Sequence, residues 1–160
     1  MVNGIFQPPT PHNEPVKGYV RGSPERAELE AELACQMAEV LEIPCIINGE
    51  EVWTDNVVEQ VMPHNHGHVL ARVHLAGEKE VKDAIEASLS AHKAWSTMPW
   101  EARGAIFLKA AAMLAGSRRQ EINASTMLNQ SKTCHQAEID SACELIDFWR
   151  FNVDLSLIHI

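Results

Sequence analysis

The sequence has 160 residues, of which 46% are hydrophobic and 22% are charged, an ordinary balance for a chain that buries one moderate core. Its 13 basic and 22 acidic residues give a formal net charge of -9, which would repel nucleic acid and anionic membrane surfaces. We therefore expect no nucleic-acid or membrane partner, and no apolar run approaches the roughly 20 residues that span a bilayer. The 4 cysteines lack CxxC spacing, which favours reduced thiols over a disulfide framework.

The N-terminal region predicts an extended arm followed by a helix. Residues 1–15 hold four of the 8 prolines, which favour extended backbone, so we expect residues 1–18 to lie as an arm on the surface. Ser23 and Pro24 then form a typical helix start, with Ser23 as the N-cap and Pro24 at the first helical position. This helix should end before Pro44, because the residue that precedes a proline disfavours helical angles.

The strongest local signal is a β-hairpin centred on the dipeptide Asn48-Gly49. This dipeptide supplies the positive φ angles of a tight turn, so residues 45–47 and 51–54 should pair as two short strands. Further extended segments cover residues 60–66 and 68–76, on either side of a bend marked by proline. Together these segments predict a small antiparallel β ribbon.

Three histidines, His64, His66 and His68, alternate within this ribbon. In a strand they would share one face and could bind a transition metal. We expect no metal site, since Pro63 and Gly67 interrupt the strand and no carboxylate or thiol ligand lies nearby in sequence.

Four consecutive helices are predicted after the ribbon. They cover residues 78–98, 100–115, 117–130 and 130–152. Gly116 is the expected C-cap of the second helix, Ser117 the N-cap of the third, and Ser131 or Thr133 the N-cap of the long fourth helix. The sequence therefore predicts an α+β fold, a helix-rich segment with a small antiparallel β ribbon.

The fourth helix is apolar on two sides, which indicates two packing partners. A core-facing stripe comprises Ile139, Ala142, Cys143, Ile146, Arg150 and Val153. A second arc comprises Leu145, Phe148 and Phe151, and Glu144 lies within that arc. A carboxylate among aromatic side chains should be partly desolvated, so Glu144 is either a substrate contact or a hydrogen-bonded structural acid.

Local motifs indicate no complete catalytic or cofactor site. Cys134, beside Lys132 and His135, is the only cysteine in surroundings that favour a thiolate. Neighbours in a helix point in different directions, however, so Cys134 and His135 do not face each other as a nucleophile and its base must. Cys143 belongs to the apolar stripe and is expected to pack in the core. No GxGxxG or P-loop is present to hold a phosphate.

Longer stretches of the sequence resemble one branch of a known family. These are NEPVKGYVRGSPERAELEAEL, IPCIINGEEVWT, QVMPHNHGHVLA, AIFLKAA and QSKTCHQAEIDSACELIDFWRFN. Together they resemble the delta-1-pyrroline-5-carboxylate dehydrogenases of the aldehyde dehydrogenase superfamily, from about residue 13 to residue 153. The resemblance implies an NAD-dependent oxidation of L-glutamate γ-semialdehyde to L-glutamate in proline catabolism. It also implies an α/β aldehyde dehydrogenase-like fold, a homo-oligomer and, for eukaryotic members, the mitochondrial matrix.

The resemblance places the chemical machinery outside these 160 residues. The family's cysteine nucleophile, glutamate base, oxyanion-hole asparagine and most of its NAD-binding sheet lie beyond this chain. We therefore expect no catalytic, cofactor-binding or metal-binding residue here, and an isolated chain that is inactive and binds no NAD. In the family, the acid matching Glu144 lies near the aldehyde end of the substrate channel, and aromatics such as Phe148 help to wall it.

The ends of the chain depart from the family pattern. Residues 19–154 match the N-terminal portion of the domain, whereas residues 155–160 are unlike the family. Residues 1–12 show no arginine-rich presequence, so a mitochondrial location is implied by resemblance alone. An alternative function is that of a short non-catalytic isoform, a helical binding module for full-length subunits.

Overall fold

The computed structural model describes residue 4 and residues 7–159. Its elements in chain order are α1 (Pro24–Ala38), β1 (Leu41–Ile43), β2 (Cys45–Ile47), β3 (Glu50–Val52), β4 (Val57–Met62), β5 (Asn65–His74), α2 (Glu78–Thr97), α3 (Trp100–Ala115), α4 (Arg119–Gln130), α5 (Cys134–Ala137), the π-helical segment η1 (Glu138–Cys143) and α6 (Glu144–His159). This mixture of helices and small sheets confirms the predicted α+β composition.

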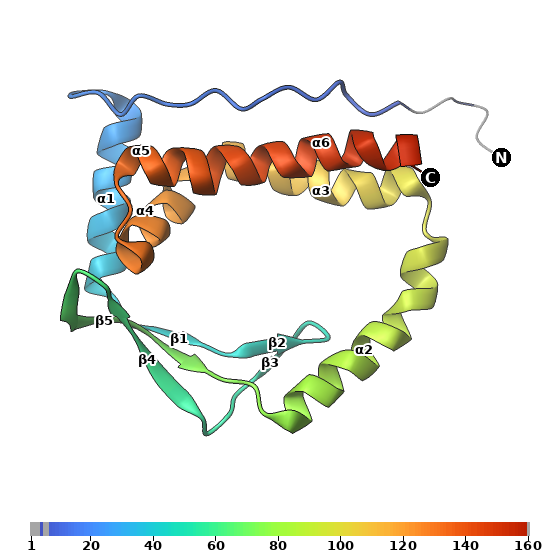
Figure 1. Ribbon diagram of the computed structural model, residues 1–160, viewed down its shortest axis with the longest axis horizontal. Helices are drawn as coiled ribbons and strands as arrows, with labels where there is room; N and C mark the ends of the chain where they lie inside the picture. The colour runs from blue at the N-terminus through green and yellow to red at the C-terminus, as the bar shows by residue number, and fades with distance from the viewer. Residues whose placement is uncertain (1–3, 5–6, 160) are drawn as a thin grey trace.

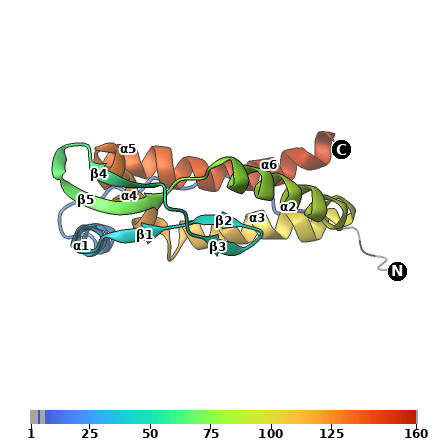
Figure 2. The ribbon, with the colours of Figure 1, turned by 90° about the horizontal axis from the view of Figure 1, so that it is seen from below.

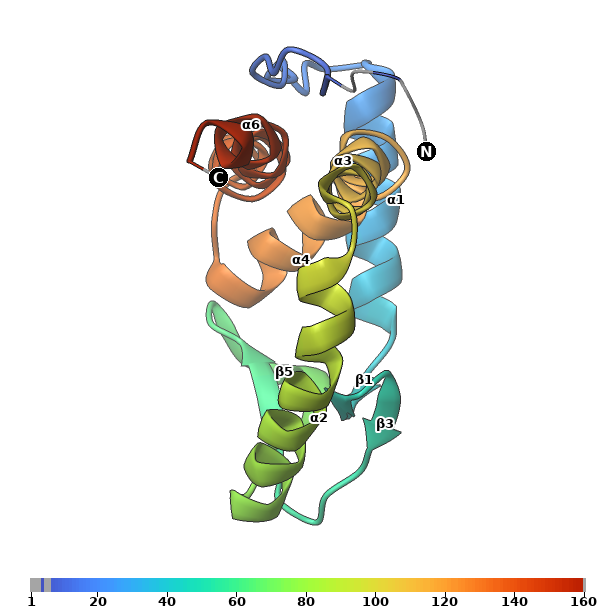
Figure 3. The same ribbon diagram turned by 90° about the vertical axis from the view of Figure 1, so that its right-hand side faces the viewer.

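The elements form an open frame. In Figure 1, α3 and α6 lie side by side along one edge, the strands lie at the opposite edge, and α1 and α2 connect the two. Residues 7–20 form no helix or strand and run along α6. Figure 2 shows that the frame is shallow, and Figure 3 shows α4 between the α3–α6 pair and the sheet. None of the helices in the described residues is long and apolar enough to cross a membrane.

Helix α1 begins as predicted. Ser23 is the N-cap, its Oγ accepts a hydrogen bond from the Arg26 amide at 3.4 Å, and Pro24 occupies the first helical position. The helix ends at Ala38, before Pro44, which confirms that prediction too.

The strands are only partly those predicted. The hairpin around Asn48-Gly49 is confirmed, with φ angles of 54° and 81° at its turn, although β3 begins at Glu50. The antiparallel ribbon predicted over residues 60–76 is confirmed in the pairing of β4 with β5. The sequence did not predict β1, which pairs in parallel with β5 and forms a sheet of order β1-β5-β4. Strand β1 has three exposed residues and a partner thirty positions away, so no local periodicity marks it.

The predicted caps of the later helices have mixed outcomes. Gly116 is the C-cap of α3, as expected, and its amide donates to the Ala112 carbonyl at 3.2 Å. Ser117 is not the N-cap of α4, because that position is held by Arg118 and no side chain makes a cap hydrogen bond there. Helix α4 therefore starts at Arg119, one residue later than an N-cap at Ser117 would give.

The predicted regular helix over residues 130–152 is wrong in two respects. First, Ser131 adopts the left-handed conformation with φ 54° and ends α4, so the next helix begins at Cys134. Of the two predicted N-caps, Thr133 is confirmed, because it caps α5 in a reciprocal box with Gln136. Second, the helix passes through η1, in which a backbone amide donates to the carbonyl five residues earlier. It then continues in α6 to His159. Residue 154 marks no break in α6.

The main core lies between α3, α4, η1 and α6. Its buried side chains are Ala111, Leu114, Ala142 and Ile146. The predicted core-facing stripe is confirmed at Ala142, Cys143, Ile146 and Val153, which are all buried. Leu145 packs against this same core, so its assignment to the second arc is wrong. The assignment assumed about 100° of rotation per residue throughout, whereas the wider π-helical turns of η1 rotate the residues that follow by a different amount.

Candidate functional site

The two predicted site residues, Glu144 and Phe148, lie on α6 in one shallow depression. Asn13, Asp147 and Phe151 complete its lining, and its volume is about 380 Å³. Glu144 is exposed and Phe148 is 59% exposed. The expected shielding of Glu144 by aromatic side chains is therefore absent within the described part of the chain. The structure brings both residues to one surface and leaves that surface open.

The N-terminal arm forms one side of this depression. Asn13 donates from Nδ2 to Asp147 Oδ2 at 2.8 Å, and the Glu14 amide donates to Asp147 Oδ1 at 2.7 Å. One turn farther along α6, Arg150 pairs with the Glu14 carboxylate at 2.7 Å. These contacts fasten the arm to the helix that carries the site.

The π-helical segment η1 sets the position of Glu144. The Glu144 amide donates to the Ile139 carbonyl, five residues earlier, so Glu144 is the first residue after the π-helical turns. Such turns are rare and are often found at functional sites, because they rotate the side chains that follow. The direction of Glu144 thus depends on an irregularity directly before it.

Below this surface, Glu138 of η1 is completely buried and accepts hydrogen bonds from several groups. Tyr19 Oη lies at 2.8 Å, Asn123 Nδ2 at 2.8 Å and the Lys17 amide at 2.7 Å. The guanidinium of Arg119, also completely buried, donates to both carboxylate oxygens and to Glu14. This buried cluster joins the arm, α4 and η1, and its charged groups are fully paired.

The electrostatics of the cluster fix its protonation states. Burial alone would raise the pKa of Glu138, but hydrogen bonds from Arg119, the Lys17 amide, Tyr19 and Asn123 outweigh it and hold the pKa at about 2. Burial raises the pKa of Tyr19, and the neighbouring Glu138 carboxylate adds to the rise. Glu138 is therefore ionised and Tyr19 protonated at neutral pH, which suits a structural anchor and not proton transfer.

Sequence reasoning missed this cluster. Arg119 and Asn123 are spaced four residues apart on α4, which places them on one helix face. That spacing indicates a polar face, but both side chains are buried against Glu138. Their partner follows in a separate helical segment, and no local pattern indicates that the two segments meet there.

The cysteines and histidines make no catalytic arrangement in the described residues. Cys134 begins α5, yet burial raises the pKa of its thiol, which is the reverse of what a nucleophile needs. Burial, with Glu138 nearby, raises the pKa of Cys143 to about 11, in accord with packing. His64 lies 2.7 Å from the Ser131 hydroxyl, and the described residues bring no three potential ligands together in a group that could hold a metal ion.

Comparisons with known proteins identify the family. Residues 52–157 match the model of the aldehyde dehydrogenase family. The chain is 51% identical to the human mitochondrial delta-1-pyrroline-5-carboxylate dehydrogenase over 140 residues, and 48% identical to the Agaricus bisporus enzyme over 149 residues. Among solved structures, the delta-pyrroline-5-carboxylate dehydrogenase of Mycobacterium tuberculosis bound with NAD superposes with a TM-score of 0.95 at 44% identity.

These matches cover nearly all of this chain but a minor part of each relative. The match to the human enzyme spans 88% of this chain and 25% of that enzyme, and the match to the Agaricus enzyme spans 92% of this chain and 27% of that enzyme. The Mycobacterium structure matches 97% of this chain with 29% of its own. The chain thus spans about a quarter of the length of its relatives. The resemblance read from the sequence is confirmed, and the chain belongs to the aldehyde dehydrogenase family.

Proposed function

We propose that this chain supplies the N-terminal portion of an NAD-dependent dehydrogenase that oxidises L-glutamate γ-semialdehyde to L-glutamate. The aldehyde, formed from 1-pyrroline-5-carboxylate, would give up a hydride to NAD⁺ while water supplies the second carboxylate oxygen. The observation that carries this proposal is the superposition of 97% of the chain on the NAD-bound Mycobacterium enzyme with a TM-score of 0.95. A fold alone would not support a substrate, but 44% identity within one enzyme branch does.

In this proposal, Glu144 and Phe148 form part of the substrate-channel wall. Both lie on an open depression, and residues outside this chain would cover it and supply the nucleophile, base and cofactor site. The buried Arg119–Glu138 pair would hold η1, and therefore Glu144, in place. The 160-residue chain alone would neither bind NAD nor turn over the aldehyde.

The setting of the complete enzyme follows from the same relatives. The matching human, rat and mouse enzymes are named mitochondrial, which supports the mitochondrial matrix as the location in a eukaryotic source. The partners would be a small-molecule substrate and further copies of the same enzyme.

A segment exchange tests the proposal. Residues 13–153 of this chain would replace the matching segment of the human enzyme, and NADH formation from glutamate γ-semialdehyde would be followed by absorbance. We expect the exchanged enzyme to be active and the isolated chain to be inactive. A folded, NAD-binding exchange enzyme without aldehyde turnover, or robust turnover by the isolated chain, would contradict the proposal.

A substitution within the exchanged enzyme tests the role of Glu144. Glu144→Ala should lower aldehyde turnover more than it weakens NAD binding, since Glu144 lies on the proposed substrate wall. Glu28→Ala, which removes another exposed acid, on α1, is the matched control. Equal aldehyde turnover and equal NAD binding in the two variants would show that Glu144 is an exposed acid with no part in substrate binding.

The alternative, a non-catalytic helical binding module, rests on exposed apolar side chains. Helix α2 buries no residue, and Val81, Ile85 and Leu89 on it are 51%, 55% and 71% exposed. These residues would pack against a full-length subunit or against the rest of a longer chain. Capture of purified full-length enzyme by the tagged chain would favour the module, and loss of capture in Leu89→Glu would locate the contact. No capture of full-length subunits would count against it.

A further inference from the structure

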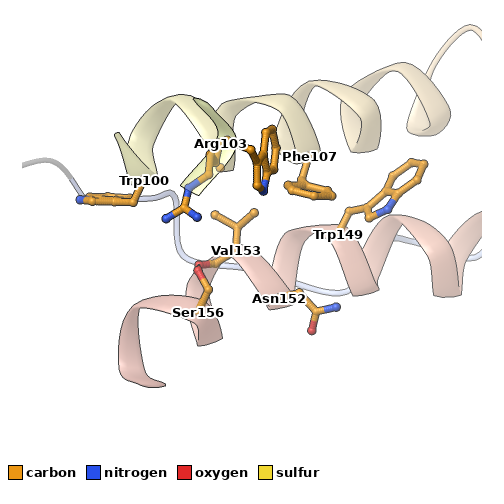
Figure 4. A pocket seen from close by; sticks show the side chains of 9 residues that line it. Trp100, Arg103, Phe107, Trp149, Asn152, Val153 and Ser156 are labelled. Atoms are coloured by element: carbon orange, nitrogen blue, oxygen red, sulfur yellow. The ribbon is translucent and has the colours of Figure 1, made fainter. Parts of the chain in front are cut away.

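A second pocket, separate from the Glu144 depression, lies between α3 and α6. Its volume is about 350 Å³, and its aromatic lining comes from Trp95, Trp100, Phe107 and Trp149. Figure 4 shows Arg103 and Phe107 of α3 facing Val153 and Trp149 of α6 across this space. Pockets that bind small ligands have volumes from about 300 Å³ and predominantly apolar walls with few polar groups. This pocket has the size and the lining of such a site.

The close approach of the two helices fixes one part of the pocket. A Cβ atom added to Gly104 of α3 would lie 3.2 Å from Val153 Cγ1 of α6. That distance is tighter than ordinary van der Waals contact, so α3 and α6 touch at this point. The pocket is thus built on packed helices, which hold its walls in place.

The chief polar group of the pocket is the guanidinium of Arg103. Its Nε is buried and has no hydrogen-bond partner, and across the described residues no carboxylate pairs with this side chain. In Figure 4 the guanidinium extends from α3 towards Val153 and Ser156 of α6. A buried donor without an acceptor costs free energy, and a cationic donor costs more than a neutral one.

The other arginines that are not exposed show what Arg103 lacks. Arg119 pairs with Glu14 and Glu138, and Arg150 pairs with Glu14. Each of these carboxylates reaches its arginine from a different segment. Arg103 is half-buried, with its Nε shielded in the pocket wall, and no carboxylate in the described part of the chain pairs with it.

We propose that this pocket binds a small organic acid with an aromatic body, whose carboxylate pairs with Arg103 and whose ring lies among the tryptophans. The guanidinium supplies a planar fork that matches a carboxylate, and the aromatic lining supplies apolar contact. The net charge of -9 disfavours anions at the surface in general, so binding depends on this local cation. The proposal needs neither NAD nor an aldehyde and is independent of the dehydrogenase function.

Paired ligands test the charge requirement. The probes are phenylacetate and phenylacetamide, which have nearly the same shape and differ in charge, and binding is followed by titration calorimetry and tryptophan fluorescence. We expect the protein to bind the acid at least about ten-fold more tightly than the amide. Equal affinities, or no saturable binding of the acid, would overturn the proposal.

Variants locate the site. Arg103→Gln should reduce the acid-over-amide preference to less than about two-fold, whereas Arg21→Gln, which removes an exposed arginine outside the pocket, should retain it. Asn152→Trp places bulk on the exposed rim of the pocket and should weaken both probes while leaving Arg103 intact. A preference that survives in Arg103→Gln would overturn the proposal. If Arg103→Gln does not fold, unchanged acid binding by folded Asn152→Trp would overturn it equally.

Discussion

Arg119 of α4 and Glu138 of η1 form an ion pair in which both side chains are completely buried. The same carboxylate accepts from Tyr19 and from the Lys17 amide, so the pair also anchors the arm. Glu138 stands six residues before Glu144, at the start of the π-helical segment. The pair therefore connects the stability of the fold to the geometry of the proposed substrate wall.

Removing one member of this pair should be strongly destabilising. Arg119→Met leaves Glu138 as a buried charge without its cation, and such changes cost about 3 to 5 kcal/mol. Exposed pairs such as Arg26–Glu30 contribute at most about 1 kcal/mol, so Arg26→Met is the matched control. Urea unfolding at neutral pH measures both. Similar midpoints for the two variants would show that the buried pair is not an anchor.

The double variant Arg119→Met/Glu138→Leu separates charge from packing. If an unpaired charge causes most of the loss, the double variant should be more stable than Arg119→Met alone. Strict additivity of the two single changes would instead mean that the residues do not interact.

Stability should fall steeply in acid because of Glu138. Its pKa is about 2 in the folded chain against an ordinary value of 4.5, so the unfolded chain takes up the proton first as the pH decreases. The ionised Glu138 carboxylate makes its full contribution to the free energy of unfolding above about pH 4.5, and this contribution is lost as the pH falls towards about 2. Its total is on the order of 3 kcal/mol. Urea midpoints across this range measure it.

The matched variant for the pH series is Glu138→Gln, which keeps the shape and removes the titrating group. It should be less stable at neutral pH and should lose less stability between neutral and acidic pH than the parent chain does. Parallel pH profiles for the two proteins would assign the acid sensitivity to other carboxylates.

Some of these features could be predicted from sequence because their causes are local. Ser23-Pro24 and Asn48-Gly49 each fix backbone geometry within a few residues, and both predictions are confirmed. Helical spacing also placed Ala142 and Ile146 in the core. The same spacing brought Glu144 to notice as an acid beside aromatic residues.

Other features depend on contacts between distant segments, which no local pattern contains. The parallel pairing of β1 with β5 joins residues 41–43 to residues 71–73. The π-helical turns of η1 alter the helix phase without a proline or glycine to mark them. Glu138 was missed as a site residue because its burial depends on Arg119 and on an arm more than a hundred residues away.

Two serines offer a test of helix capping. Ser23 caps α1 through its side chain, whereas the segment after Ser117 starts without any side-chain cap bond. Ser23→Ala should therefore cost about 1 kcal/mol and Ser117→Ala less than about 0.5 kcal/mol. Thermal and urea unfolding of the two variants measure the difference. A larger cost at Ser117 would mean that it contributes in a way that the described contacts do not show.

Two apolar residues of α6 separate packing from surface function. Ile146 is completely buried, so Ile146→Ala should cost about 2 to 5 kcal/mol. Phe148 is 59% exposed, and Phe148→Ala should cost less than about 1 kcal/mol in this chain. Urea unfolding measures both. If Phe148→Ala lowered the free energy of unfolding as much as Ile146→Ala, the Phe148 ring would be part of the packed core. That result would argue against its role in the substrate-channel wall.

The cysteines should differ sharply in reactivity towards an aromatic disulfide reagent. Cys35 is exposed, whereas Cys143 is buried and its pKa is raised from 9.0 to about 11, which lowers its thiolate fraction about a hundred-fold. At mildly alkaline pH the native chain should therefore show a fast reaction at Cys35, and Cys35→Ser should abolish that phase. Cys143 should react only on the timescale of unfolding, and added urea should accelerate it. A fast phase that persists in Cys35→Ser and disappears in Cys134→Ser would restore Cys134 as an activated thiol, in contradiction to the raised pKa that burial gives it.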